Sequence, residues 1–186
     1  YEEFCIRRWL VLAAFMNSQG LQRVFYLDSD TVIFSNATEE TRCFSGSCPA
    51  LLSRSSSTSG HLSYWTKAGA STLADFIVDA FKRSNIARIE KIWNNYRSSF
   101  EDRGEKVRGG VSDMLLLEWF LAGRNSSVCT LDPEAYDHMH AALDENFRRD
   151  ALGLPYMVYK RDFGRTVVRM KSLHFQGASK DLINNC

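Results

Sequence analysis

Two aspartates stand two positions apart, directly after an apolar run in the first part of the chain. The run covers residues 24–27, and Asp28 and Asp30 follow it. Carboxylate oxygens are the hard ligands that magnesium and manganese prefer. A divalent ion held there could bind the diphosphate of a nucleotide and act as its Lewis acid. The alternative is an ordinary strand end with two solvated carboxylates, because an Asp-x-Asp pair also arises by chance.

A second group of candidates lies near the other end of the chain. His174 directly follows the strand-like run 166–173, and Gly177 and Lys180 come shortly after it. Histidine is a ligand for manganese or zinc. Glycine lets backbone amides approach a phosphate closely, and lysine supplies a point charge. The structural alternative is a helix-capping turn with an exposed lysine.

Charged residues in the first turns of two predicted helices form a third group. Arg7 and Arg8 lie early in a helix predicted over 4–19, where the helix dipole does not favour cations. They are either solvated, or one of them faces an anionic ligand near the aspartate pair. Asp113 follows the predicted cap Ser112, so it either complements the helix dipole or presents an acid to a substrate.

The elements that must position these side chains follow from the apolar spacing. The uninterrupted run before Asp28 indicates a strand buried on both faces, as in a parallel sheet. Ligands bind beyond the carboxyl ends of such strands, which would bring both aspartates to a binding edge. The Ser-rich stretch 53–60 favours a mobile surface loop. The remaining predictions are a strand over 61–65, helices over 67–82 and 113–122, and a helix with core-facing Ile86, Ile89, Trp93 and Tyr96.

Length and composition favour one α/β domain over residues 1–186, without a linker or a repeat. A net charge of +1 gives no electrostatic reason for nucleic-acid binding, and no apolar run reaches membrane-spanning length. The chain opens at Tyr1 and enters a predicted helix at once, so we expect a fragment whose upstream part is missing. Cys43 and Cys48 could close a small loop, whereas His138 and His140 are poor candidates for a metal pair.

Four segments together resemble the nucleotide-sugar-dependent glycosyltransferases of the GT-A fold. Residues 7–9 with 24–30 look like the helix and Asp-x-Asp strand of that group. Residues 173–180 resemble the H-x-x-G-x-x-K element of retaining members such as the glycogenin-like family. Gly110-Val111-Ser112-Asp113 resembles the segment that carries an acid close to the donor sugar, and 61–65 resembles a block found in uncharacterised proteins of this group. The resemblance covers most of the chain.

This resemblance implies a fold and a donor. The fold would be a Rossmann-like mixed, mainly parallel sheet flanked by helices, lacking its N-terminal nucleotide-base-binding strands. The donor would be a nucleotide-diphosphate sugar, uridine diphosphate sugar being the first choice, and the acceptor is open. Transfer would retain the anomeric configuration. The compartment would be the Golgi lumen if the full chain carries a signal anchor, and otherwise the cytoplasm.

The resemblance also implies residue roles. Asp28, Asp30 and His174 would hold manganese or magnesium, with Asp28 also contacting the ribose or diphosphate. Gly177 and Lys180 would lie at the diphosphate, where the lysine neutralises the leaving group.

On the donor-sugar side, Arg8, or as the second choice Arg7, would contact the donor, and Asp113 would orient its hydroxyls. Two departures stand against the family pattern: none of the 27 residues before Asp28 resembles the base-binding unit, and Asp181-Leu182 replaces the usual Pro-Trp after Lys180.

Two rival interpretations stay open. Haloacid-dehalogenase-type phosphatases also place D-x-D-x-[TV] after an apolar strand, which residues 28–32 fit. Under that interpretation Asp28 would be a phosphorylated nucleophile and Asp30 an acid/base. However, the sequence after residue 30 lacks the paired-acid loop that binds magnesium in that class, and His174 has no role in it. The other rival is a glycosyltransferase-like binding domain without turnover.

Overall fold

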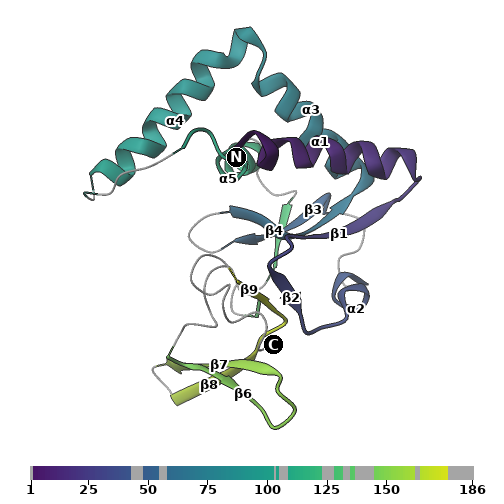
Figure 1. The fold of residues 1–186 in the computed structure, drawn as a ribbon, viewed down its shortest axis with the longest axis vertical. Coiled ribbons are helices and arrows are strands. Elements are labelled where there is room, and N and C mark those ends of the chain that lie inside the picture. The colour runs from purple at the N-terminus through teal and green to yellow at the C-terminus, as the bar shows by residue number, and fades with distance from the viewer. Residues whose placement is uncertain are drawn as a thin grey trace.

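The computed structural model describes residues 2–42, 48–54, 58–102, 104, 109–122, 128–131, 135–136, 145–161 and 164–175. These residues form a mixed α/β fold with a helical layer over one face of a sheet and two smaller β-sheets beyond the other (Figure 1). The helices are α1 Glu2–Ser18, α2 Ala37–Arg42, α3 Lys67–Ala80, the 3-10 turn η1 Arg83–Asn85, α4 Ile86–Glu101 and α5 Asp113–Ala122. The strands are β1 Arg23–Leu27, β2 Thr31–Ile33, β3 Ala50–Arg54, β4 Thr58–Thr66, β5 Val128–Thr130, β6 Phe147–Arg149, β7 Pro155–Arg161, β8 Gly164–Arg169 and β9 Ser172–His174.

The central sheet has the strand order β1-β4-β3-β5. β4 pairs antiparallel with both β1 and β3, and among the described strands only β3 and β5 pair in parallel. The prediction of a mixed α/β fold is confirmed, whereas the described pairings do not form the mainly parallel sheet that was expected. The reason is local: β3 and β4 follow each other closely in sequence, and such neighbours pair most readily as antiparallel strands.

β1 is not buried on both faces, so that prediction is wrong. Within the described residues it lies at the edge of the sheet, its burial is partial, and Leu27 is 38% exposed. An uninterrupted apolar run does not distinguish a central strand from an edge strand that packs against helices. Here one face of β1 packs under α1, since the Tyr26 and Trp9 rings lie 5.2 Å apart.

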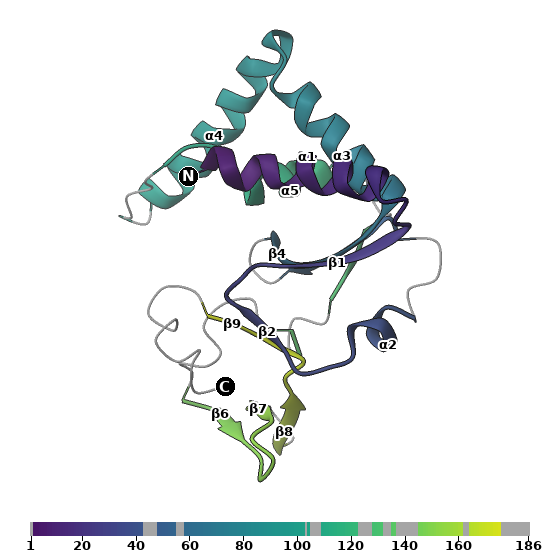
Figure 2. The same ribbon diagram turned by 45° about the vertical axis from the view of Figure 1, so that its right-hand side comes forward.

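Helices α1, α3 and α5 lie together over one face of the central sheet (Figure 2). The buried core between these layers contains Trp9, Met16, Trp65, Leu73 and Leu117. Trp9 sits so close to β4 that a Cβ at Gly60 would lie 2.2 Å from its ring. Glycine at that position therefore permits the contact between α1 and the sheet.

The predicted helix boundaries are largely confirmed. α1 ends before Gly20, which has a φ of 66° and lets the last turn close. Thr66 caps α3 by accepting a hydrogen bond from the Gly69 backbone N–H at 3.0 Å. Ser112 likewise accepts a hydrogen bond from the Leu115 backbone N–H at 3.3 Å at the start of α5.

The predicted core face of α4 is mostly wrong. Of the four side chains expected there, only Ile89 is buried, and Ile86 is 38% exposed. α4 turns away from the helical layer after η1 (Figure 1), so Trp93 and Tyr96 stack on each other rather than against the sheet. Periodic spacing identified the helix correctly but could not tell how much of the molecule would cover it.

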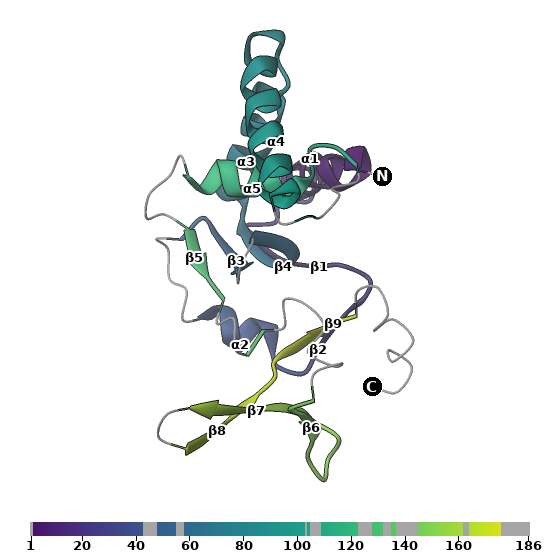
Figure 3. The ribbon, with the colours of Figure 1, turned by 90° about the vertical axis from the view of Figure 1, so that its left-hand side faces the viewer.

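The strands beyond the other face of the sheet form two smaller units. β2 pairs antiparallel with β9, and β6, β7 and β8 form a three-stranded antiparallel sheet (Figure 3). The predicted run 166–173 is thus two strands, β8 and β9. The expected mobile loop over 53–60 is wrong where it is described, since Thr58 and Ser59 are buried in β4.

Among the described residues, none of the helices combines the length and the apolar character that crossing a bilayer requires. Cys48 is disulfide-bonded, and Cys43, the partner that the sequence suggests, lies outside the described residues.

Candidate functional site

A short turn between β1 and β2 carries both aspartates. The Asp28 backbone N–H donates to the His61 carbonyl at 2.7 Å, which extends the β1–β4 pairing by one residue. The Thr31 N–H then donates to the Asp28 carbonyl at 3.1 Å and closes the turn. Because both ends of the turn belong to strands, the two carboxylates are held on a fixed backbone.

Strand β9 brings His174 to this turn from the far end of the chain. The antiparallel register pairs Thr31 with His174, and the Phe175 N–H donates to the Asp30 carbonyl at 2.8 Å. The His174 Nε2 therefore lies 3.4 Å from the Asp30 Oδ1, although 144 positions separate the two residues. The predicted meeting of His174 with the aspartates is found in the structure.

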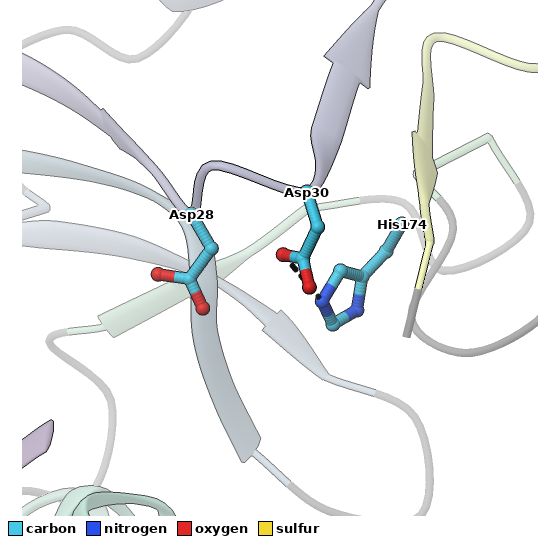
Figure 4. Close-up of side chains that lie close together, drawn as sticks. All are labelled: Asp28, Asp30 and His174. Atoms are coloured by element: carbon cyan, nitrogen blue, oxygen red, sulfur yellow. Dashed lines mark ion pairs between the residues drawn. The ribbon is translucent and has the colours of Figure 1, made fainter. Parts of the chain in front are cut away.

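We call Asp28, Asp30 and His174 the metal-candidate cluster. One ligand atom from each side chain lies within 4.8 Å of the other two (Figure 4). His174 is buried, and both aspartates are partly buried. Two carboxylates with one imidazole suit manganese, which accepts oxygen ligands together with nitrogen. The donor set fits the predicted metal, while metal binding itself stays a prediction.

Arg8 lies on the other side of Asp28. Its Nη1 donates to the Asp28 Oδ1 at 2.6 Å, and its Nη2 donates to the Asp113 Oδ2. The Tyr26 hydroxyl accepts from Arg8 at 3.3 Å and donates to the same Asp28 oxygen at 3.1 Å. Arg7 instead pairs with Glu3 on the exposed side of α1. Of the two arginines, Arg8 is thus the one that faces the aspartate pair.

Asp113 is buried and held from two directions. The residue is 5% exposed, and the Trp9 Nε1–H donates to its Oδ2 at 3.2 Å, beside the bond from Arg8. Its place in the first turn of α5 also complements the helix dipole. A dipole effect alone does not require a buried carboxylate bonded to an arginine. The contacts therefore give Asp113 a second structural role, because it joins α5 to Arg8 and Trp9 of α1. Arg8, Trp9, Tyr26, Asp28 and Asp113 are called the Arg8 network below.

Electrostatics favour the charged form of Arg8 and the neutral form of Tyr26. Burial lowers the pKa of the Arg8 guanidinium, but the nearby Asp113 and Asp28 carboxylates outweigh it, so that pKa is raised above its ordinary value. Burial is also the main reason why the pKa of Tyr26 is raised, with Arg8 opposing the shift and Asp28 adding to it. Arg8 therefore carries a permanent positive charge between two carboxylates.

The hydrogen bonds to the Asp28 side chain use one of its two carboxylate oxygens. Both side-chain hydrogen bonds that described residues make to it end on Oδ1. The other carboxylate oxygen makes no such bond within the described part of the chain. Asp28 can therefore belong to the Arg8 network through one oxygen and to the metal-candidate cluster through the other.

Sequence reasoning overlooked three residues that build the site. His61 stacks on His174, Trp9 binds Asp113, and Tyr26 bonds to both Arg8 and Asp28. Tyr26 and Asp28 are two apart on a strand, so a shared face was a usable signal. Nothing in the spacing pointed to His61 or to Trp9 as site residues.

Two predicted donor-site residues are not described. Gly177 and Lys180 lie outside the described residues, as do His138 and His140. Of the predicted site, the structure therefore brings together Arg8, the metal-candidate cluster and Asp113.

No protein-family model matches this chain, and no curated protein sequence is significantly similar to it.

Proposed function

We propose that this chain is a GT-A-type glycosyltransferase domain that uses a metal ion to transfer a sugar from a nucleotide-diphosphate sugar. The observation that carries the proposal is the convergence of Asp28, Asp30 and His174 from two strands far apart in sequence. An isolated Asp-x-Asp pair is common, whereas a buried histidine delivered to that pair by β-pairing is a much more specific arrangement.

The chemistry of the site supports transfer from an activated donor. Asp28, Asp30 and His174 would hold manganese, or magnesium as the second choice. When bound, the metal supplies positive charge to the diphosphate and acts as a Lewis acid for its departure. Asp28 contributes one carboxylate oxygen and keeps the other bonded to Arg8 and Tyr26.

The Arg8 network supports a donor-sugar site next to the metal. Asp113 is fixed by Arg8 and Trp9, and its carboxylate would accept hydrogen bonds from the hydroxyls of the donor sugar. Arg8 donates to both Asp113 and Asp28. It would therefore hold the acid that orients the sugar at a fixed position relative to the diphosphate site. Gly177 and Lys180 stay predicted contacts of the diphosphate, and uridine diphosphate sugar is the proposed donor.

The direct test is a donor-hydrolysis screen of a full-length protein against nucleotide sugars with manganese. We expect manganese-dependent release of nucleoside diphosphate, lost in Asp30→Asn. The same preparations are assayed with p-nitrophenyl phosphate. Phosphate release from that compound without donor hydrolysis would favour the haloacid-dehalogenase interpretation. Tight binding of uridine diphosphate with manganese, but no turnover in any condition, would favour a non-catalytic binding domain.

A further inference from the structure

The ring of His61 lies flat against the ring of His174. Their centroids are 4.1 Å apart, and the two planes differ by only 5°. Both residues are buried, with exposed fractions of 1% for His61 and 6% for His174. The two rings come from β4 and β9, which belong to different sheets. This contact is therefore made across the boundary between the central sheet and the β2–β9 pair.

His61 is itself held in place by its own strand. Its Nδ1 lies 2.7 Å from the Ser59 Oγ, and its backbone N–H donates to the same oxygen at 3.3 Å. Ser59 precedes His61 by two positions, so both side chains project from one face of β4. A buried ring that is anchored at a nitrogen has little freedom to rotate.

His61 contacts two members of the metal-candidate cluster, Asp28 and His174. Its carbonyl accepts the Asp28 backbone N–H at 2.7 Å, and its ring covers His174. The backbone contact sets the aspartate turn and does not depend on the side chain. The ring contact is made by the side chain, so the two contributions can be separated by mutation of His61.

We infer that His61 is a positioning residue that fixes the ring plane of His174 for metal binding. A histidine ligand must direct one nitrogen lone pair at the metal, and an imidazole free to turn about its Cβ–Cγ bond pays entropy to do so. Stacking on His61 restricts that rotation, and Asp30, 3.4 Å from Nε2, selects the edge of the ring that faces the cluster. The inference rests on the metal site proposed above.

The expected effect is moderate, because His61 makes no bond to the metal. Residues that orient metal ligands change metal affinity by about 10–100-fold when hydrogen-bonded to them. A stacked aromatic pair contributes less, about 0.5–1.5 kcal/mol, which corresponds to roughly 2–12-fold in affinity. We therefore expect a fall of about 3–10-fold in manganese affinity when the His61 ring is removed.

The test compares manganese binding by the whole chain in six forms: wild type, His61→Ala, His61→Phe, His174→Ala, Ser59→Ala and Tyr64→Phe. Free manganese is followed by electron paramagnetic resonance during a titration with manganese alone. His61→Ala should bind about 3–10-fold more weakly, and His61→Phe, which restores a flat ring without nitrogen, should bind within about twofold of wild type. Tyr64→Phe is the matched control, since Tyr64 is a buried residue of the same strand whose hydroxyl has no partner in the described residues.

A spectroscopic readout separates positioning from general loss of stability. Coupling between bound manganese and the imidazole nitrogen should persist in His61→Phe and weaken in His61→Ala, at saturating metal. Ser59→Ala keeps the His61 ring but removes its anchor, so it should give a smaller loss than His61→Ala even if the alanine variant folds poorly.

Three results would overturn the inference. Unchanged affinity and unchanged nitrogen coupling in a folded His61→Ala, with wild type and His174→Ala clearly different, would refute it while leaving the metal site intact. A His61→Phe variant as weak as His174→Ala would make His61 a ligand through its nitrogen instead. Absence of manganese binding by the wild type would remove the proposed metal site, and this inference with it.

Discussion

The two sides of Asp28 compensate charge in different ways. On one side the Arg8 network surrounds two carboxylates with a guanidinium, a phenol and an indole, all supplied by the chain. On the other side the metal-candidate cluster gathers two carboxylates around a single imidazole. Like charges this close raise the free energy of the folded state unless a cation joins them. Among the described residues, the first side thus has its own cation, Arg8, whereas under the proposed function the second side would take a cation from solution.

The elements that build the two sides also differ. The Arg8 network comes mostly from helices α1 and α5, through long side chains that reach down to the sheet. The metal-candidate cluster is set by backbone pairing, since β1, β2, β4 and β9 fix its residues at strand ends. We therefore expect side-chain substitutions to damage the fold on the first side and metal binding on the second.

The largest expected effect is on the stability of the metal-free protein, where substitutions in the Arg8 network and in the metal-candidate cluster should differ. Arg8→Met leaves the Asp113 carboxylate buried without its cation, so the free energy of unfolding should fall by about 2–4 kcal/mol, the upper values for such pairs being reduced because Arg8 is partly exposed. Asp30→Asn removes one of two adjacent carboxylates and should change stability by at most about 0.5 kcal/mol, in either direction. Urea unfolding in the presence of a chelator measures both. Equal losses in the two variants would contradict the comparison.

Ligand addition should reverse that pattern. Manganese with uridine diphosphate at 100 times its dissociation constant stabilises by about 2.7 kcal/mol, so a full-length protein should melt about 5–10 °C higher. We expect a smaller rise for the 186-residue chain, similar for pyrophosphate and uridine diphosphate, because none of the residues before Asp28 resembles a base-binding unit. Differential scanning fluorimetry follows both shifts.

The control for this ligand effect is Asp30→Asn, in which both shifts should vanish. Arg8→Lys, which keeps a positive charge beside Asp28, should retain most of the shift. A rise of the same size without manganese, surviving Asp30→Asn, would mean that the diphosphate binds elsewhere.

A third prediction concerns Asp113, which belongs to the Arg8 network. Asp113→Asn weakens the bonds from Arg8 and Trp9 and should cost about 1–2 kcal/mol of stability, more than the helix dipole alone provides. Turnover should fall while nucleotide affinity stays nearly unchanged, as for an interaction used mainly in the transition state. Chemical denaturation and steady-state kinetics are measured on the same samples.

Asp79→Asn is the matched control for Asp113→Asn. Asp79 pairs with Lys82 at 3.0 Å, but both side chains are about 60% exposed, so its loss should cost less than about 0.5 kcal/mol. Wild-type turnover in a destabilised Asp113→Asn would leave Asp113 as a purely structural residue.

The sequence allowed the metal-candidate cluster to be predicted because its signals are local. Asp28 and Asp30 follow an apolar strand, His174 ends another, and each type has a clear ligand chemistry. The helices were predictable for the same reason, through caps at Thr66 and Ser112. What joins them is non-local pairing, and the sequence alone did not reveal that β2 pairs with β9.

The parts that could not be predicted depend on which surface covers which. The apolar run of β1 looked central but lies at an edge of the described sheet, and the aromatic stripe of α4 looked buried but is largely not. The stack of His61 on His174 is a contact between two sheets. Such contacts follow from the assembly of elements, which periodicity within one element does not specify.

The smallest expected effect is the change in stability caused by Tyr26→Phe. Its dependence on pH tests the charge balance of the Arg8 network. The pKa of Tyr26 is raised, mainly by burial, so the folded state favours the neutral phenol. A group whose pKa is higher in the folded than in the unfolded state stabilises fully below the unfolded value, about 10 for tyrosine, and loses that contribution as pH rises through the folded value. Wild type should therefore be about 0.5–1 kcal/mol more stable than Tyr26→Phe up to about pH 9.5, because its hydroxyl bonds to Arg8 and Asp28.

Above that pH the advantage of wild type over Tyr26→Phe should shrink. Arg8 keeps its charge throughout this range, so the change reports the phenol alone and not the guanidinium. Urea unfolding at several pH values between 8 and about 11 gives the difference in stability between the two proteins. Tyr156→Phe, on β7 and outside the network, corrects for alkaline unfolding that is common to any tyrosine variant. A difference that widens with pH would mean that Arg8 stabilises ionised Tyr26 more than burial destabilises it. The positive charge of Arg8 would then not be fully neutralised by Asp28 and Asp113.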